Sequence, residues 1–334
     1  MVNRDIHFSL WLDFVERDFL KHKFVALIEK GVINGATSNP SIFASAITTS
    51  PAYKEQLSSL RKKTPKEKYE ALAIEDIRTA AHALRGCYDT GNDGYISIEV
   101  DPFLAHDTQG TIAEGQRLFA AIAAPNVMIK VPATEAGYAA MTTLLSTGIS
   151  VNATLVFSPK QAKKCLKAMK KGMDAFEADG GGRCEGVISV FVSRFDRLLD
   201  SALASEGIET EKTGIYNAAK IYHMIEENNT PSIRTLFAST GVKGDALPAD
   251  YYMRGLLAKH TVNTAPLSTI EAYISTEASL PALPIDKELI DGYFTKLEDN
   301  GFSMDAIYKE LLEDGLASFE KAFKEMLDIL NENK

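Results

Sequence analysis

The segment NVMIKV (126–131) places one lysine, Lys130, inside a run of apolar residues. This composition is typical of a strand in a parallel sheet that is buried on both faces. Burial disfavours a charged ammonium and so favours the neutral amine, which is the form that attacks a ketone to give an imine. Lys130 is therefore a candidate nucleophile. The alternative is a structural lysine that pairs with Glu99 or Asp13.

Other candidate strands are also apolar until their last residues, where a polar or ionisable side chain appears. With Lys130, these residues are Asp13, Asn39, Glu99, Asn152, Thr154, Ser189 and Ser239. In a closed parallel barrel the carboxyl ends of the strands surround one mouth, so residues far apart in the sequence would converge on a single pocket. Alternatively, each polar residue simply terminates its strand.

Strand parity suggests a role for two of these side chains. Glu99 has the parity of Ser97, and Thr154 that of Asn152, so each pair points to one side of its strand. A carboxylate and a hydroxyl that face the same pocket can hold a water molecule, and this water can relay protons while an imine forms and hydrolyses. An ion pair for Glu99 and a strand-end hydrogen bond between Asn152 and Thr154 are the alternatives.

The elements that must position these residues alternate between short apolar stretches and longer helical patterns. The candidate strands are 9–13, 35–39, 95–100, 126–131, 150–157, 186–192, 234–239 and 260–264. About eight strands separated by helices predict an α/β fold, a (β/α)8 barrel. No linker divides the chain, so we expect a single domain over residues 1–334.

Helix signals fill the intervals between these strands. A helix over about 15–30 should end at Gly31, and Ser158-Pro159 is a typical helix start. Leu312, Leu316, Phe319, Phe323, Met326 and Leu330 form the apolar stripe of a long C-terminal helix, for which core packing is the expected role. The stretch 47–67 is rich in Ser, Thr and Lys and is expected to form a surface insertion.

Composition excludes several classes of protein. A formal charge of -9 and a pI near 5.3 argue against a protein that binds duplex nucleic acid. The sequence predicts neither a leader nor a bilayer-spanning segment, so the expected location is cytoplasmic. Cys87, Cys165 and Cys184 have no paired spacing, and the histidines are dispersed, so we expect reduced, buried thiols, no metal and no cofactor.

Two segments resemble the signature segments of transaldolases: GATSNPSIF (35–43) and VMIKVPATEAG (127–137). The resemblance continues through WLD, ISIEVD, NATLVFS, ISVFVSR and FASTG, and it spans nearly the whole chain. It implies a single (β/α)8 barrel, Schiff-base chemistry, sugar-phosphate substrates and a place in the non-oxidative pentose phosphate pathway. A homodimer is expected by analogy with the family.

The resemblance also implies catalytic roles. Lys130 would form the Schiff base with C2 of a ketose phosphate, and Asp13 would take the proton of the C4 hydroxyl. Glu99 and Thr154 would hold the catalytic water.

Substrate-binding roles follow in the same way. By resemblance, the residues that bind hydroxyl groups or line the pocket are Asn39, Asn152, Thr37, Ser189 and Phe191. Arg194 fits the family's phosphate-binding arginine. After Ser239 the chain reads STGVKG, without the arginine that one branch of the family has there, so Lys243 is the nearest candidate for a second cation.

Three other functions remain as alternatives. A fructose 6-phosphate aldolase would share the lysine strand but release free dihydroxyacetone, and Glu99 and the longer chain argue against it. A Schiff-base lyase acting on a keto acid would not account for GATSNPSIF. A barrel that binds sugar phosphates without catalysis is the alternative of another class.

Overall fold

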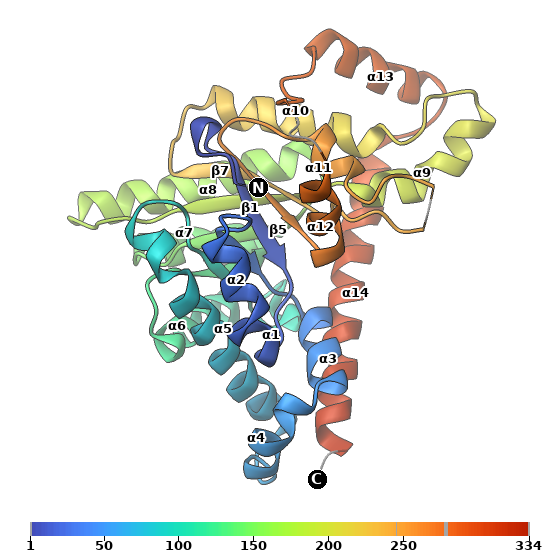
Figure 1. Ribbon diagram of the computed structural model, residues 1–334. Coiled ribbons are helices and arrows are strands. Elements are labelled where there is room, and N and C mark those ends of the chain that lie inside the picture. The colour runs from blue at the N-terminus through green and yellow to red at the C-terminus, as the bar shows by residue number, and fades with distance from the viewer. Residues whose placement is uncertain (1, 245, 277–279, 333–334) are drawn as a thin grey trace.

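Eight parallel strands close into a barrel in the order of the chain, within residues 2–244, 246–276 and 280–332, which the computed structural model describes (Figure 1). The strands are β1 (Ser9–Asp13), β2 (Gly35–Thr37), β3 (Ile96–Glu99), β4 (Val127–Pro132), β5 (Val151–Val156), β6 (Gly186–Phe191), β7 (Ile233–Ala238) and β8 (Thr261–Ala265). The predicted (β/α)8 barrel is therefore confirmed. The second strand ends two residues early because Asn39 begins the next helix.

Helices follow the strands and surround the barrel. They are α1 (Arg17–Lys21), α2 (Lys23–Glu29), α3 (Pro40–Thr49), α4 (Lys54–Ser59), α5 (Pro65–Asp89), α6 (Thr108–Ile122), α7 (Glu135–Ser146), α8 (Pro159–Ala178), α9 (Ser193–Ser205), α10 (Thr213–Glu227), α11 (Tyr251–Gly255), α12 (Leu267–Ser275), α13 (Lys287–Asp299) and α14 (Met304–Glu332), with 3₁₀ turns η1 (Arg4–Ile6), η2 (Pro51–Tyr53) and η3 (Pro102–Leu104). The expected helix over 15–30 is interrupted at His22, whose φ of -126° and ψ of -79° are not helical. Gly31 has a φ of 63°, as expected after a helix.

Side-chain caps fix the turns by which the chain leaves three of the strands. Asn39, Thr134 and Ser158 accept hydrogen bonds from the backbone amides three residues further on, each at 3.0 Å. Each cap satisfies an amide that has no partner within its helix, so the helix starts at a defined residue. The predicted start at Ser158-Pro159 is confirmed.

A single tryptophan, Trp11, fills part of the barrel interior. Its indole Nε1 donates to Asp93 Oδ2 at 2.9 Å, and Asp93 pairs with Arg234, which lies near the start of β7. Gly35 makes room for the ring, because a Cβ atom there would lie 2.4 Å from Trp11 Nε1. This buried cluster closes the barrel at its amino-terminal end, away from the strand ends that carry Lys130 and Glu99.

The C-terminal helix α14 runs along one side of the molecule beside α3 (Figure 1). Of the predicted stripe, Leu316, Phe319, Phe323, Met326 and Leu330 are buried, while Leu312 is partly buried. At Gly315 a Cβ atom would lie 3.0 Å from Leu155 Cδ2 of β5, so this helix packs directly on the strand ends. Here α14 covers the mouth of the barrel.

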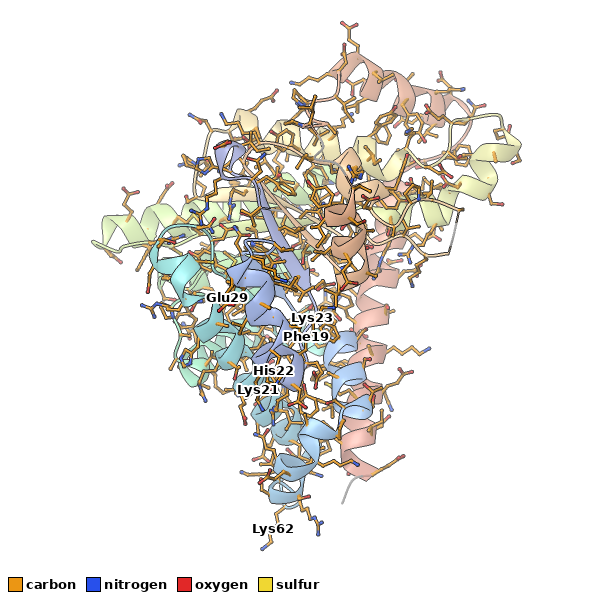
Figure 2. All side chains as sticks on the ribbon, in the orientation of Figure 1. Phe19, Lys21, His22, Lys23, Glu29 and Lys62 are labelled. Carbon is orange, nitrogen blue, oxygen red and sulfur yellow. The ribbon has the colours of Figure 1, made fainter. Side chains whose placement is uncertain are left out.

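The expectation of a surface insertion over 47–67 is only partly correct. Lys62 points into solvent at the tip between α4 and α5 (Figure 2), but Tyr53 is fully buried. Its hydroxyl donates to Asp76 Oδ2 at 2.8 Å, and Asp76 also accepts from Arg17 Nε at 2.8 Å. The segment is thus tied to α5 and to the start of α1 by buried polar groups.

The three cysteines are free thiols. Cys165 and Cys184 are buried as expected, whereas Cys87 is partly exposed, on the last turns of α5. Within the described ranges, no helix has the combination of length and hydropathy that crossing a bilayer requires.

Candidate active site

Lys130 lies in register between Glu99 of β3 and Asn152 of β5, the two strands adjacent to β4. The register pairs Glu99 with Lys130 across β3 and β4, and Lys130 with Asn152 across β4 and β5. Lys130 is 6% exposed, and its Nζ lies 3.4 Å from Glu99 Oε2 and donates to the backbone carbonyl of Ser38 at 3.2 Å. A structural lysine and a nucleophile would both form this ion pair, so its surroundings must distinguish the two.

Glu99 is buried, and among the described residues its carboxyl group lacks the well-aligned hydrogen bonds that a buried carboxylate normally has. Neither of its oxygens forms a well-aligned hydrogen bond with a described residue. Desolvation raises the pKa of Glu99 to about 7, although the nearby Lys130 acts in the opposite direction. A carboxyl group with this pKa can both donate and accept a proton at neutral pH, as general acid–base catalysis requires.

Thr154 sits at an irregularity in β5. The register with β6 shifts between Ala153 and Val156, and Leu155 has a φ of 56°, which is uncommon for a residue with a side chain. Such bulges redirect side chains and are frequent next to active sites. Thr154 Oγ1 is buried without a hydrogen-bond partner among the described residues, as are the Glu99 oxygens. Buried polar atoms of this kind normally bond to water or to a ligand.

Asp13 lies at the end of β1, where two threonines fix its orientation. Thr37 donates to Asp13 Oδ1 at 2.6 Å, and the Thr37 and Thr264 hydroxyls are 2.7 Å apart. Desolvation raises the pKa of Asp13, while Lys130 and the Thr37 hydrogen bond oppose this shift. The direction of the Lys130 effect agrees with the predicted convergence of Asp13 and Lys130, which stays a prediction.

A chain of hydrogen bonds connects the strands in the barrel interior through Asn152. Asn152 donates to Ser97 Oγ at 3.0 Å and accepts from Ser189 at 2.6 Å, so its amide links β5 to the adjacent β6 and, across β4, to β3. Thr154 is not hydrogen-bonded to Asn152, contrary to the structural alternative for this pair. The Asn39 oxygen caps α3, which leaves its Nδ2 group as the donor available to a ligand.

The segments that follow β6 and β7 carry a cation, Arg194, and two hydroxyl groups, those of Ser193 and Ser239. The guanidinium of Arg194 lies 5.2 Å from the centre of the Phe191 ring. The hydroxyls of Ser193 and Ser239 are 3.0 Å apart. Desolvation and the nearby Arg197 charge lower the pKa of Arg194, whereas Asp314 acts in the opposite direction, and no described side chain forms a hydrogen bond or ion pair with the guanidinium. An unpaired, partly buried guanidinium is suited to bind an anion.

Two features lie apart from this group. Lys243 is exposed and has no hydrogen bond or ion pair with a described residue, so its predicted role in phosphate binding stays a prediction. A groove of about 1080 Å³ lies beside the mouth, between the starts of α7 and α8 and the α13–α14 connection, and none of the predicted catalytic residues lines it. Its volume alone does not make it the reaction site, because the two carboxyl groups predicted to be catalytic, Asp13 and Glu99, whose pKa values are raised, do not line it.

Metal coordination has no obvious site in the described part of the chain. No group of three or more His, Cys, Asp or Glu side chains is arranged there to hold an ion. Metal-independent chemistry stays a prediction.

Several residues at the mouth were missed or misjudged from the sequence. Phe319, expected only as part of the packing stripe, places its ring 5.7 Å from Lys130 Nζ. Thr264 follows the strand-end pattern that singled out the other polar residues, and this pattern could have identified it. Ser38 contributes a backbone carbonyl, for which the sequence has no signal.

Comparisons with known proteins agree with this geometry. The family model described as transaldolase/fructose-6-phosphate aldolase matches residues 10–330. A protein of Campylobacter jejuni named transaldolase is 44% identical, covering 97% of this chain and 99% of the relative. A protein of Helicobacter pylori with the same name is 43% identical, covering 96% and 98%. The chain therefore belongs to the transaldolase/fructose-6-phosphate aldolase family.

Proposed function

We propose that this protein is a transaldolase of the non-oxidative pentose phosphate pathway. It transfers a dihydroxyacetone unit from sedoheptulose 7-phosphate or fructose 6-phosphate to glyceraldehyde 3-phosphate or erythrose 4-phosphate. The observation that carries this proposal is the buried amine of Lys130, 3.4 Å from a carboxyl group whose pKa is near 7. Family membership and the names of the relatives support it.

The first half of the reaction makes the covalent intermediate. The Lys130 amine attacks C2 of the ketose phosphate, and the carbonyl oxygen takes up two protons and leaves as water. Glu99 and Thr154 bind this water, and Glu99 transfers protons to and from it. The product is a protonated imine on Lys130, which can accept an electron pair.

The second half breaks and remakes one carbon–carbon bond. Asp13 takes the proton of the C4 hydroxyl, the C3–C4 bond breaks, and its electrons move into the imine to give an enamine. An aldose phosphate leaves, and the enamine carbon then attacks the aldehyde carbon of the acceptor, whose oxygen takes the proton back from Asp13 and becomes the new C4 hydroxyl. Hydrolysis of the new imine releases the product and restores the amine.

The remaining predicted residues bind the substrate in this proposal. Asn39 and Asn152 bind sugar hydroxyls, and Thr37, Ser189 and Phe191 line the pocket. Arg194 binds the phosphate group, with Ser239 beside it and Lys243 as a second cation. The unpaired guanidinium of Arg194 is the observation that supports the phosphate assignment.

The test is to trap the intermediate. Borohydride added with fructose 6-phosphate should leave a three-carbon adduct on Lys130, located by peptide mass spectrometry. Lys130→Met should abolish both the adduct and sugar exchange, whereas Lys160→Met, which changes an exposed lysine, should preserve both. Absence of the adduct from the parent protein under turnover conditions would contradict the proposal.

Fructose 6-phosphate aldolase is the second candidate because the matching family model includes that activity. A transaldolase forms a new ketose phosphate only when erythrose 4-phosphate is supplied, whereas an aldolase releases dihydroxyacetone without an acceptor. Measuring both products with and without the acceptor separates the two.

We also propose, by analogy with the family alone, a homodimer in the cytoplasm with the chain folded as one domain. Sedimentation at several protein concentrations would test the assembly, and a monomer at all concentrations would rule it out.

A further inference from the structure

The Lys130 amine has two oxygen neighbours among the described residues, and they come from different strands. One is the Ser38 carbonyl at 3.2 Å, directly after β2, and the other is Glu99 Oε2 at 3.4 Å, at the end of β3. The ring of Phe319 covers the amine from α14 at 5.7 Å. Two acceptors and an aromatic face therefore lie around the nitrogen of this buried side chain.

The geometry of a neutral amine determines how these two acceptors orient the nitrogen lone pair. Its nitrogen carries the Cε atom, two hydrogens and one lone pair in an approximately tetrahedral arrangement. A carbonyl and a carboxylate accept hydrogen bonds but donate none, so they can engage the hydrogens and never the lone pair. If the Ser38 carbonyl and Glu99 take the two N–H groups, the lone pair points in the one remaining direction and is free to attack.

The Ser38 carbonyl is itself held in place. The Ser38 hydroxyl donates to the backbone carbonyl of Ser97 at 2.8 Å, and Ser38 is fully buried. Ser97 lies two residues before Glu99 on β3, so this bond ties one acceptor of Lys130 to the strand that carries the other. The Ser38 carbonyl belongs to the peptide group that joins Ser38 to Asn39. The Asn39 side chain caps α3 and so holds the Asn39 end of this peptide group in place.

We propose that Ser38 is a positioning residue for the nucleophile: its carbonyl and the Glu99 carboxyl orient the two N–H groups of Lys130, and its hydroxyl fixes that carbonyl. This inference rests on the proposed Schiff-base function. When the lone pair attacks C2, the π electrons move to the oxygen, and one N–H proton is transferred to it. A second proton, from Glu99, lets it leave as water. The protonated imine keeps one N–H, for which the Ser38 carbonyl remains the acceptor.

Removal of the hydroxyl tests the proposal. In Ser38→Ala the carbonyl loses its tether to β3, so the amine should be less well oriented for attack. We expect the saturating rate of imine formation with fructose 6-phosphate, measured by rapid quenching in borohydride, to fall by about tenfold. The substrate concentration at half-saturation should change by less than about twofold, because the fully buried Ser38 hydroxyl is already bonded to the Ser97 carbonyl.

Two variants serve as controls. Ser38→Thr keeps a hydroxyl donor and should restore the rate of imine formation to within about threefold of the parent. Ser150→Ala removes another buried hydroxyl, which accepts from Glu185 N at 3.1 Å at the opposite end of the barrel. It should leave the rate of imine formation unchanged even if thermal stability falls, so it separates orientation from general stability.

The outcomes distinguish this inference from the proposed function. A parent protein that forms no adduct on Lys130 refutes the function, and the inference with it. A parent that is labelled, together with Ser38→Ala labelled at the same rate, refutes only the role of Ser38. Should Ser38→Ala fail to fold, Ser38→Cys replaces it, because a thiol fills the same place but is a weak donor. Equal imine rates for Ser38→Cys and Ser38→Thr would then overturn the inference.

Discussion

At the scale of single residues, the acidity of Glu99 links stability to the proposed chemistry. Its pKa is raised from 4.5 to about 7 because the carboxyl group is desolvated. Between these pH values the folded protein binds a proton that the unfolded chain has released. The contribution of Glu99 to stability is therefore fully present below about pH 4.5 and is lost as the pH rises through about 7.

This linkage predicts a difference in pH dependence between the parent and Glu99→Gln. The glutamine cannot titrate, so the variant should lack the part of the stability loss that Glu99 causes between pH 5 and 8. That part should reach at most about 1.4 kcal/mol per pH unit. Urea unfolding at four pH values measures it, and parallel curves for the two proteins would contradict the assigned pKa.

The same variant should be slow in catalysis. Loss of a general acid and base typically lowers the rate by about 10²- to 10⁴-fold. The effect should appear in the trapped-imine assay, because proton transfer to the leaving water belongs to that step. In the parent, the rate of imine formation should fall as the pH rises through about 7, because the protonated form of Glu99 disappears. A pH profile that is flat from 6 to 8 would show that another group donates this proton.

The residues that could be predicted are those whose chemistry is visible in their side chains. Lys130 and Glu99 are ionisable groups in apolar strands, which is costly without a role. Ser38 acts at the nitrogen through its backbone, and every residue has a carbonyl. Leu155 adopts a positive φ that its residue type disfavours, so no sequence rule places a bulge beside Thr154.

At the scale of elements, β2 depends on a glycine that accommodates Trp11. In Gly35→Ala the new methyl group would overlap the indole ring, which is fully buried and cannot move aside without disturbing Asp93. We expect a loss of about 1–3 kcal/mol in the free energy of unfolding, measured by urea denaturation. Gly86→Ala is the matched control, because it lies inside α5 with no atom near its added methyl group, and it should be neutral or stabilising. Equal effects of the two substitutions would contradict the packing described for Trp11.

Helix α14 contributes an aromatic face over the reactive nitrogen. A protonated imine on Lys130 would be stabilised by the Phe319 ring and shielded from water. In Phe319→Leu we expect release of free dihydroxyacetone, relative to transfer, to rise by roughly fivefold, since a cation–π contact contributes about 1 kcal/mol. Comparing dihydroxyacetone with the new ketose phosphate measures this ratio.

Phe323→Leu is the control for this substitution. It makes the same change one turn further along α14, where the side chain is also buried but contacts Tyr69 and Phe103. Its transfer ratio should match that of the parent. If both variants release dihydroxyacetone equally, the effect reflects loosening of the helix and not the ring over Lys130.

Regular elements could be predicted because their periodicity is local. The eight strands and the stripe of α14 follow from apolar spacing, and the helix starts follow from capping residues. The burial of Tyr53 within a polar stretch could not be predicted, because its partners Arg17 and Asp76 are distant in sequence. The same is true of the way α14 covers the mouth, since its stripe indicates a buried face but not what that face contacts.

At the scale of the whole molecule, the barrel brings the Glu99 carboxyl group of β3 to 3.4 Å from the Lys130 amine of β4, and the proposed mechanism adds Asp13 of β1 and Thr154 of β5. In this arrangement the protonated imine accepts the electrons of the broken bond, which is the task that a metal ion performs in other aldol chemistry. We expect activity to be unchanged after dialysis against EDTA, measured by coupled sugar exchange. Loss of activity that returns on addition of a divalent ion would contradict the Schiff-base mechanism.

The position of α14 in the chain also bears on how the protein is synthesised. A ribosome completes all eight strands, and with them the reactive amine, before it makes the helix that covers that amine. A nascent chain that ends before Phe319 lacks the aromatic ring that lies 5.7 Å from Lys130 Nζ in the folded protein. The Phe319 ring comes to lie over the nitrogen only when α14 packs against the strands made before it.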